Sequence, residues 1–412
     1  MNYQESKDYL YNLGYELSTK KFGLQNTQIL LEALGNPQES FFKIQVAGTN
    51  GKGSTSAFLS SIATTAKIKT GLFTSPHLIE ITERIRINDQ DINQEIFAEH
   101  ATRIRLLSEQ LVEQNKLQTL PTFFEQVTAI ALSIFAEQKI ELAILETGLG
   151  GRFDSTTATH PEVAVFTPIS LDHQNILGHT ISQIAQEKAQ IIHPESKTIL
   201  SSEQVAEAMT VLNLRAKELN KSIIVVKTDP DVKNLSLAGE HQKQNASLAV
   251  EVSRQLNQFN FDITDENISQ GLESAHHSGR LELIKNILLD GAHNLSGIKA
   301  LTSFLQTTIT KPITLIFGVL KDKDITKMTE ILFPVVDTIF LTTVNNPRAL
   351  TTLQIAHQTS QLIRAKNMYL TNTIEEALTK AQNLKLDNQI VVAGSLYLVG
   401  EAKQILEKEK RS

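Results

Sequence analysis

The sequence of 412 residues contains no cysteine, which excludes disulfide bonds and thiolate metal sites and fits a reducing compartment. It also contains no run of about 18 apolar residues, the length that a membrane-spanning helix requires. Residues 1–10 are polar and charged, and they lack the apolar core of a signal peptide. From these absences we expect a cytoplasmic protein with no membrane partner.

An excess of positive charge is missing as well. The chain has 39 basic and 45 acidic residues, which gives a formal net charge of −6. Nothing therefore predicts non-specific attraction to nucleic acid, and any anionic ligand has to be held by local groups. The composition, 41% hydrophobic and 20% charged, is that of a soluble globular protein whose length allows two or three domains.

Apolar strands alternate with helical stretches along most of the chain, which predicts βαβ units and mostly parallel sheets. In the first part, we predict strands at 41–47, 69–73, 141–146, 162–168 and 197–200, and helices at 54–66 and 122–138. A small, polar stretch at 274–280 interrupts this pattern. After it, we predict strands at 287–289, 313–318, 338–342 and 389–393. The sequence thus predicts two α/β domains, residues 1–280 and 281–412.

A glycine-rich loop, Gly-Thr-Asn-Gly-Lys-Gly-Ser-Thr at 48–55, joins the first predicted strand to a helix. Such a loop directs backbone N–H groups and a helix N-terminus at a phosphate, and Lys52 can neutralise phosphate charge while a hydroxyl faces Mg²⁺. The usual P-loop pattern is not met, because Val46 replaces its first glycine and Gly53 separates Lys52 from Ser54. A plain turn is the alternative, but the flanking strand and helix favour nucleotide binding.

Polar side chains stand at the ends of other predicted strands, where ligands gather in open parallel sheets. Glu146 is suited to hold the Mg²⁺ of MgATP, with a loop or capping acid as the alternative. His173 could ligate a second cation or orient a phosphate, but an isolated histidine is more often structural. Ser75 begins a turn that could be an ordinary exposed loop. For Lys188, helical periodicity alone predicts a solvated charge.

Ten motifs, taken together and in order, resemble the bacterial dihydrofolate synthase/folylpolyglutamate synthase family from about residue 23 to 402. They are AGTNGKGST, TSPHL with ERIRIN, PTFFE, ETGLGGRFDST, SLDHQNILG, EKA, SGRLE, LDGAHN, GVLKDKD and GSLYLVGEA. The resemblance implies the Mur ligase architecture. In it, an N-terminal P-loop ATPase domain with a mostly parallel sheet and a smaller, Rossmann-like C-terminal glutamate ligase domain close over ATP.

The resemblance also implies roles for residues of the first domain. The ATP phosphates would be held by Asn50, Gly51, Lys52, Gly53 and Ser54. One Mg²⁺ would be held by Ser75 and Glu146, and another by Glu146 and His173. Lys188 matches a lysine that is carbamylated in this family, which turns a cation into a carboxylate-like group of the metal site.

Further implied roles concern the nucleotide base, the hinge and the pterin. Asn245 matches a residue that contacts adenine, Arg280 a hinge arginine that reaches the phosphates, and Asp290 an acid that contacts the ribose. His293 would help to close the site. The pterin pocket would be lined by Phe124, Arg152, Asp154 and Ser155. Lys52, Lys188, His173 and Arg280 form the predicted catalytic set, and domain closure about Arg280 is expected to gate the reaction.

The chain departs from the family pattern at several positions, none of which removes a predicted ligand. Gln190 replaces a glycine after the EKA motif, and Thr157 replaces an asparagine after the GGRFDST segment. Leu295 replaces a proline after LDGAHN, and Ser278 replaces the proline of a PGR motif. The first two affect the surroundings of Lys188 and of the predicted pterin pocket.

The implied function is ligation of L-glutamate to 7,8-dihydropteroate and to tetrahydrofolate, using ATP and Mg²⁺ and an acyl-phosphate intermediate, by a monomer. A folylpolyglutamate synthase without the dihydropteroate activity is the main alternative. A cell-wall Mur ligase is disfavoured because the phosphate loop begins only about 47 residues in. A P-loop GTPase or kinase lacks support because no N-K-x-D motif is found. A non-catalytic ATP-binding module would require Glu146, His173 and Lys188 to lie apart.

Overall fold

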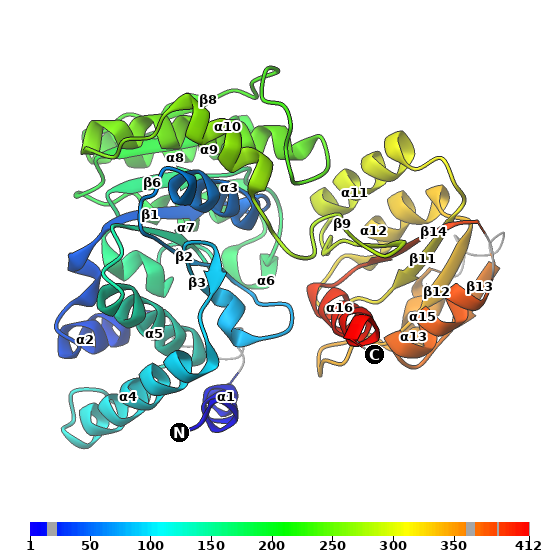
Figure 1. Cartoon of the computed structure of the whole chain (residues 1–412), viewed down its shortest axis with the longest axis horizontal. Coiled ribbons are helices and arrows are strands. Elements are labelled where there is room, and N and C mark those ends of the chain that lie inside the picture. Colours follow the sequence, from blue (N-terminus) through cyan, green and yellow to red (C-terminus); the bar gives the residue numbers. More distant parts are fainter. Residues whose placement is uncertain (15–22, 360–366, 385–386, 412) are drawn as a thin grey trace. The chain divides into compact units, whose positions relative to one another are not determined.

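The computed structural model describes residues 1–14, 23–359, 367–384 and 387–411. The chain forms two compact units. The first unit comprises Met1–Ser236 and Lys243–His276, and the second comprises Leu237–Gln242 and His277–Ser412. Each unit is an α/β structure built on a mostly parallel sheet, as the sequence predicted (Figure 1). The functional division at residue 280 stays a prediction.

The first unit is organised around an eight-stranded sheet in the order β4-β3-β2-β5-β1-β6-β7-β8. Six neighbouring strands, from β2 to β8 in this order, are parallel, whereas β3 and β4 run antiparallel. The strands are β1 (Phe42–Ala47), β2 (Thr70–Phe73), β3 (Ile85–Ile87), β4 (Gln90–Asp91), β5 (Leu142–Glu146), β6 (Val163–Phe166), β7 (Thr198–Ser202) and β8 (Ile224–Val226). The central strands are buried along nearly their whole length, which explains the almost entirely apolar sequences of β5 and β6, whereas β1 also buries Lys43 and Gln45.

Helices cover both faces of this sheet (Figure 1). They are α1 (Tyr3–Asn12), α2 (Gln25–Ala33), α3 (Lys52–Thr65), α4 (Gln94–Glu113), α5 (Phe123–Glu137), α6 (Gln174–Leu177), α7 (Ile181–Lys188), α8 (Ala206–Glu218), α9 (His241–Leu256) and α10 (Asp265–Ser274). One core joins α1, α2, α4 and α5 to β2 and β5, and a second joins α7 and α8 to β6 and β7. Helix α3 is buried from Gly53 to Ala63 and packs against α10.

The α3–α10 contact shows how closely the helix of the phosphate loop is enclosed. Gly271 of α10 lies against the backbone of Ile62, and a Cβ atom at position 271 would come within 2.7 Å of the Ile62 nitrogen. A side chain at this position would therefore force the two helices apart. The close packing fixes α3, whose N-terminus follows the glycine-rich loop.

The second unit contains a six-stranded sheet in the order β13-β12-β11-β14-β10-β9, in which β9 alone is antiparallel among these strands. The strands are β9 (Glu282–Ile284), β10 (Ile287–Leu289), β11 (Ile313–Phe317), β12 (Thr338–Leu341), β13 (Asn367–Leu370) and β14 (Gln389–Ala393). The helices are α11 (Leu295–Thr308), α12 (Ile325–Leu332), α13 (Thr352–Gln358), α15 (Ile374–Asn383) and α16 (Leu396–Arg411).

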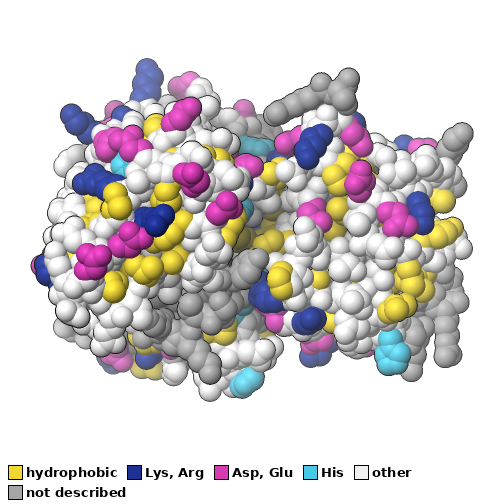
Figure 2. Space-filling view, turned by 90° about the horizontal axis from the view of Figure 1, so that it is seen from below, with side chains coloured by type: hydrophobic (Ala, Val, Ile, Leu, Met, Phe, Trp, Pro, Cys, Tyr) yellow, Lys and Arg dark blue, Asp and Glu magenta, His cyan; other side chains and the backbone are white. Residues whose placement is uncertain are grey.

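Every helix and strand that was predicted with bounds is present, with its ends within two residues of the prediction. Strands β3, β4, β8, β9 and β13 were not predicted, because they are short and lack a long apolar run. None of the described helices has the length and apolar character that spanning a bilayer requires. On the face shown in Figure 2, acidic and basic side chains are interspersed with apolar ones.

Candidate functional site

The candidate site lies where the parallel strands of the first unit end. Because β2, β5, β1, β6 and β7 are neighbours in this order and run parallel, their carboxyl ends share one edge of the sheet. Along this edge the strands lead to Ser75, Glu146, the glycine-rich loop, the segment 167–173 and Gln204. This is the edge at which open α/β sheets bind ligands.

The glycine-rich loop joins β1 to α3 and has the geometry of a phosphate-binding loop. Gly48 and Gly51 have φ values of 153° and 88°, and Gly51 directly precedes the first turn of α3. A side chain at Gly51 would collide with the Asn245 amide of α9, so Asn245 lies against the loop. Lys52 donates to the Thr49 carbonyl at 3.2 Å. The structure therefore brings the predicted phosphate-binding residues and Asn245 together at a helix N-terminus.

Lys188 is the final residue of α7, and its side chain reaches this loop. Its Nζ atom donates to the Gly48 carbonyl at 2.7 Å, and the residue is 5% exposed. Burial, and secondarily the positive charge of Lys52, lower the Lys188 pKa to about 7, against the opposing effect of Asp172 and Asp154. The expectation of a solvated charge was wrong, because Lys188 is buried and its side chain donates to the phosphate loop.

Two of the departures from the family pattern, Gln190 and Thr157, are accommodated by hydrogen bonds of their own side chains. Gln190 lies in the 3₁₀ turn Ala189–Ile191, and its amide donates to the Gln186 carbonyl on the preceding turn. Thr157 is buried, and its hydroxyl donates to the Gly151 carbonyl at 2.7 Å. The same hydroxyl accepts from the Gln45 amide of β1 at 2.8 Å, so Thr157 ties the loop after β5 to the strand that leads to the phosphate loop.

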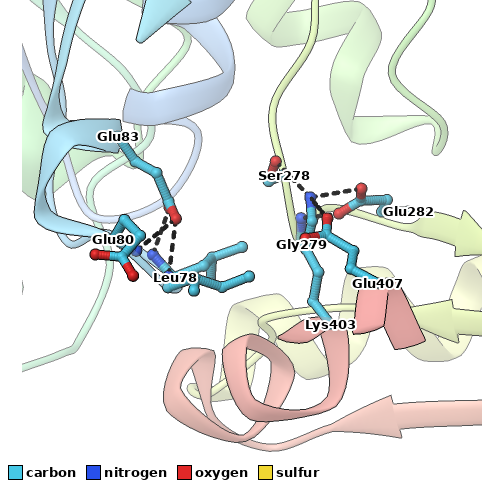
Figure 3. A network of polar contacts seen from close by, with 9 residues as sticks. Leu78, Glu80, Glu83, Ser278, Gly279, Glu282, Lys403 and Glu407 are labelled. Atoms are coloured by element: carbon cyan, nitrogen blue, oxygen red, sulfur yellow. Dashed lines mark hydrogen bonds and ion pairs between the residues drawn. The ribbon is translucent and has the colours of Figure 1, made fainter. Parts of the chain in front are cut away.

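Glu146, at the end of β5, is connected to the turn that begins at Ser75. Its Oε2 atom accepts from the Ser75 backbone N–H at 3.1 Å, and its side chain is buried. The turn itself is held by Glu83, whose carboxylate accepts from three consecutive backbone N–H groups, those of residues 78–80, at 2.7–2.9 Å (Figure 3). Two predicted metal ligands, Ser75 and Glu146, are thereby adjacent and rigidly placed.

His173 directly precedes α6 and has the left-handed conformation, with φ of 49°. The segment before it is fixed to the phosphate loop, because the Thr49 hydroxyl donates to the Ser170 carbonyl and accepts from the Ser170 N–H, both at 3.0 Å. Asp172 accepts from the His173 N–H at 2.8 Å. The segment that carries His173 is therefore placed beside the loop that carries Lys52.

Gln204 is a residue of this site that the sequence analysis missed. Its side chain hydrogen-bonds two backbone groups of the segment that leads to His173. Oε1 accepts from the Ile169 N–H at 2.9 Å, and Nε2 donates to the Thr167 carbonyl at 3.0 Å. Gln204 belongs to none of the recognised motifs. Its position just beyond a predicted parallel strand was the available signal.

Replacing Gln204 with methionine is expected to lower turnover about tenfold and to reduce the free energy of unfolding by roughly 1–2 kcal/mol. The physical reason is that methionine fills similar space but makes neither backbone hydrogen bond, so the His173 segment loses its fixed position. Steady-state kinetics as a function of Mg²⁺ concentration and urea unfolding would measure both effects. The matched control is Gln382→Met on the exposed surface of α15. Unchanged kinetics in Gln204→Met would contradict a positioning role.

The residues predicted to line a pterin pocket differ in exposure. Phe124 lies over Gly148, where a Cβ atom would approach its ring to 2.6 Å, so it contacts the loop after Glu146. Arg152 is exposed and pairs with Glu187 at 3.2 Å. The buried carboxylate of Asp154 accepts from the N–H groups of Leu149 and Thr156, and burial raises its pKa. Asp154 thus stabilises the loop after β5, which carries the exposed Arg152.

Ser155 is also buried in the first unit. Its hydroxyl accepts from the Thr27 hydroxyl of α2 at 3.3 Å. This contact fixes the beginning of the 3₁₀ turn Ser155–Thr159 against α2. Whether Ser155 and the other three residues contact a pterin stays a prediction.

The second unit holds the predicted hinge and ribose residues in one network. Asp290 is buried, and its carboxylate accepts from the N–H groups of Leu281 and Ala292, both at 3.0 Å. Burial raises the Asp290 pKa, although the charge of Arg280 opposes the shift. The Nδ1 atom of His293 donates to the Gly291 carbonyl at 2.7 Å, which fixes its tautomer.

Lys403 of α16 positions the backbone beside Arg280 and was also missed. Its Nζ atom donates to the Ser278 hydroxyl and to Glu282 Oε1, both at 2.8 Å (Figure 3). Glu282 in turn accepts from the Gly279 N–H at 2.8 Å. Ser278, one of the departures from the family pattern, therefore takes part in the network that holds the predicted hinge.

Comparisons with known proteins agree with the two-unit organisation. Residues 46–261 match the family described as "Mur ligase middle domain", and residues 275–405 match "Dihydrofolate synthetase, C-terminal domain". The dihydrofolate synthase/folylpolyglutamate synthase of Bacillus subtilis (strain 168) is 34% identical over 418 residues, which cover 94% of this chain and 95% of that protein.

Solved structures show the same fold. A folylpolyglutamate synthase of Mycobacterium tuberculosis, complexed with ADP and AMPPCP, superposes with a TM-score of 0.90 at 27% identity and covers 98% of both chains. E. coli FolC in complex with DHPP and ADP superposes with a TM-score of 0.86 at 27% identity, covering 100% of this chain and 99% of that one. The resemblance inferred from the motifs is confirmed.

Proposed function

The chain belongs to the dihydrofolate synthase/folylpolyglutamate synthase family of Mur-type ligases, and we propose that it joins L-glutamate to 7,8-dihydropteroate and to tetrahydrofolate. It is an ATP-dependent acid–amino-acid ligase. The observation that carries the proposal is the contact of Lys188 with the Gly48 carbonyl of the phosphate loop. A buried lysine of pKa about 7 can react with CO₂ as a neutral amine, which suits carbamylation and is not required of a switch GTPase or kinase.

The proposed chemistry requires activation of a carboxylate, because oxide is a poor leaving group when an amine attacks. Attack of the carboxylate on the γ-phosphorus of ATP forms an acyl phosphate and releases ADP. The glutamate amine then adds to the acyl carbon and loses a proton to water, and the tetrahedral intermediate expels phosphate to leave the amide. Positioning and charge neutralisation by Lys52 and Arg280 supply most of the catalysis, since the protein forms no covalent bond to substrate.

We propose that Ser75, Glu146 and His173 hold Mg²⁺, with carbamylated Lys188 as a further carboxylate-like group. The hydroxyl and carboxylate oxygens of Ser75 and Glu146 suit a hard cation, and the hydrogen bond between these residues already places them together. When bound, Mg²⁺ neutralises the β/γ-phosphate charge. The protein's own contribution is to hold the turn at Ser75 through Glu83 and the His173 segment through Thr49 and Gln204.

For the remaining residues, the family resemblance supports the proposed roles. Asn245 would contact adenine, and its position against Gly51 supports this. Asp290 would contact the ribose, His293 would help to close the site, and Arg280 would act as hinge. Phe124 and residues 152–155 would line the pterin pocket. We further propose a cytoplasmic monomer.

Phosphate release from ATP with L-glutamate, compared between dihydropteroate and tetrahydrofolate as acceptors, tests the proposal. Turnover with both is expected. Turnover with tetrahydrofolate alone would restrict the enzyme to folylpolyglutamate synthesis. No release with either acceptor, from folded protein that binds ATP, would refute the folate assignment and leave another Mur-type amide ligase or a P-loop NTPase.

A further inference from the structure

A second group of potential ligands lies at the amino ends of the same strands, at the edge of the sheet opposite the phosphate loop. The tripeptide His-Pro-Glu occurs twice, at 160–162 directly before β6 and at 193–195 shortly before β7. Strands β6 and β7 are parallel neighbours, with Val163 opposite Thr198. The pairing therefore brings the two tripeptides side by side.

The side chains of this group, His160, His193 and Glu195, converge. The two imidazole rings stack with centroids 3.9 Å apart and planes at 13°. Glu195 Oε2 contacts His193 Nδ1. One ligand atom from each of the three residues lies within 4.8 Å of the other two. The stacked rings are partly buried, whereas Glu195 is exposed.

The backbone around this group is held by Ser196. Its hydroxyl accepts from the His193 N–H at 3.0 Å and donates to the Pro161 carbonyl at 3.2 Å. Ser196 thus joins the two tripeptides, so the convergence of the histidines does not depend on their side chains alone. Preorganisation of this kind favours binding, because less conformational freedom is lost when a ligand arrives.

We propose that His160, His193 and Glu195 bind one divalent transition-metal ion, with Zn²⁺ as the best match. Two imidazoles and a carboxylate are a typical zinc donor set, with water in the fourth position, and they differ from the oxygen donors that Mg²⁺ prefers. Ligand atoms in tetrahedral zinc sites lie about 3.3 Å apart, as bond lengths of about 2.0–2.1 Å require. The three ligand atoms lie within 4.8 Å of one another, so binding a single ion would require one ring to turn out of the stack and the exposed Glu195 to move toward it.

The ion would join the end of the Ser155–Thr159 turn, which His160 follows, to the chain that enters β7. We therefore expect a structural site that raises thermal stability without taking part in the ligase reaction.

Zn²⁺ titration of the full chain against a chromophoric chelator tests this proposal, with excess Mg²⁺ present to occupy sites of oxygen donors. We expect one equivalent to bind to wild type and the affinity to fall at least about tenfold in His160→Gln and in His193→Gln. Affinity should be unchanged in His357→Gln, which removes an exposed histidine of α13. Zn²⁺ should raise the melting temperature of wild type but not of the two site variants.

A His173→Gln variant separates this site from the proposed catalytic one. Loss of Zn²⁺ binding in His173→Gln, or wild-type affinity in both His160→Gln and His193→Gln, would overturn the proposal. If a histidine variant does not fold, Glu195→Gln at the exposed ligand gives the same comparison. Ligase turnover without added Zn²⁺ should remain at the wild-type level in all three site variants, so the outcome is independent of the proposed function.

Discussion

Replacing Lys188 with methionine is expected to abolish most ligase activity while making the fold more stable near neutral pH. Methionine keeps the length and the apolar stem of the side chain but removes the amine that contacts the Gly48 carbonyl. We expect turnover to fall roughly 10²–10³-fold, the scale of losing one preorganised electrostatic group in an active site. If Lys188 had only a structural role, its replacement would not lower activity while raising stability.

The stabilisation follows from the lowered pKa. The unfolded chain binds a proton at Lys188 up to the ordinary pKa of 10.5, whereas the folded chain releases it near pH 7. Between these values the unfolded state holds more protons, so the free energy of unfolding of wild type rises with pH. Below pH 7 the lowered pKa of Lys188 reduces the free energy of unfolding of wild type by its full amount, roughly 4–5 kcal/mol. Lys188→Met removes this penalty but also loses the hydrogen bond to Gly48, which is worth about 1 kcal/mol. Its free energy of unfolding at pH 7 should therefore exceed that of wild type by about 2–4 kcal/mol.

Urea unfolding from pH 6.5 to 9.5 in CO₂-free buffer measures this effect, with Lys217→Met, an exposed lysine of α8, as the matched control. The difference between Lys188→Met and wild type should shrink as pH rises, and the control should show no difference. A second measurement adds bicarbonate. Carbamylation forms a bond between the amine nitrogen and CO₂ with release of a proton, so bicarbonate should raise wild-type turnover and leave Lys188→Met unchanged. Wild-type turnover in Lys188→Met would exclude a catalytic role.

The sequence was sufficient to predict features that depend on local pattern. Strands β5 and β6 are almost entirely apolar because both faces of the sheet are covered, and Gly48 and Gly51 mark the loop because their φ values are unfavourable for other residues. Glu146 and His173 were found because parallel strands place their carboxyl ends at one edge. These inferences need no knowledge of which helix covers which strand.

Features that depend on distant contacts could not be predicted. Periodicity placed Lys188 on a helical face but could not show that the phosphate loop, 140 residues earlier, lies against it. Lys403 holds Glu282 across 121 residues, and nothing in the pattern of α16 distinguishes it from a surface lysine. Gln204 hydrogen-bonds backbone groups of the segment before His173. Because nearly every residue carries such groups, the sequence of that segment does not reveal the contact. Asp154, assigned by resemblance, has a buried carboxylate that organises its own loop, a role that resemblance alone could not reveal.

Replacing Glu146 with glutamine is expected to lower kcat/KM for MgATP by about 10²-fold or more, because the loss of a carboxylate from a metal site removes several kcal/mol of charge stabilisation. Glutamine retains a carbonyl oxygen that can accept from the Ser75 N–H, so the turn that begins at Ser75 should keep its position. The loss should therefore appear in Mg²⁺ dependence and not in unfolding. Steady-state kinetics across a Mg²⁺ series would measure it, and high Mg²⁺ should restore part of the activity.

The strand that carries Glu146 also provides the control. Glu141 stands at the opposite end of β5, where its Oε1 atom accepts from the Lys69 N–H at 2.9 Å, just as Glu146 accepts from Ser75. Glu141→Gln makes the same chemical change next to the same neighbouring strand, but at the amino edge of the sheet. If charge at the carboxyl edge holds the metal, Glu141→Gln keeps its activity and Mg²⁺ dependence. Equal losses in the two variants would mean that both acids act only by joining β5 to β2, and the proposed metal role of Glu146 would be lost.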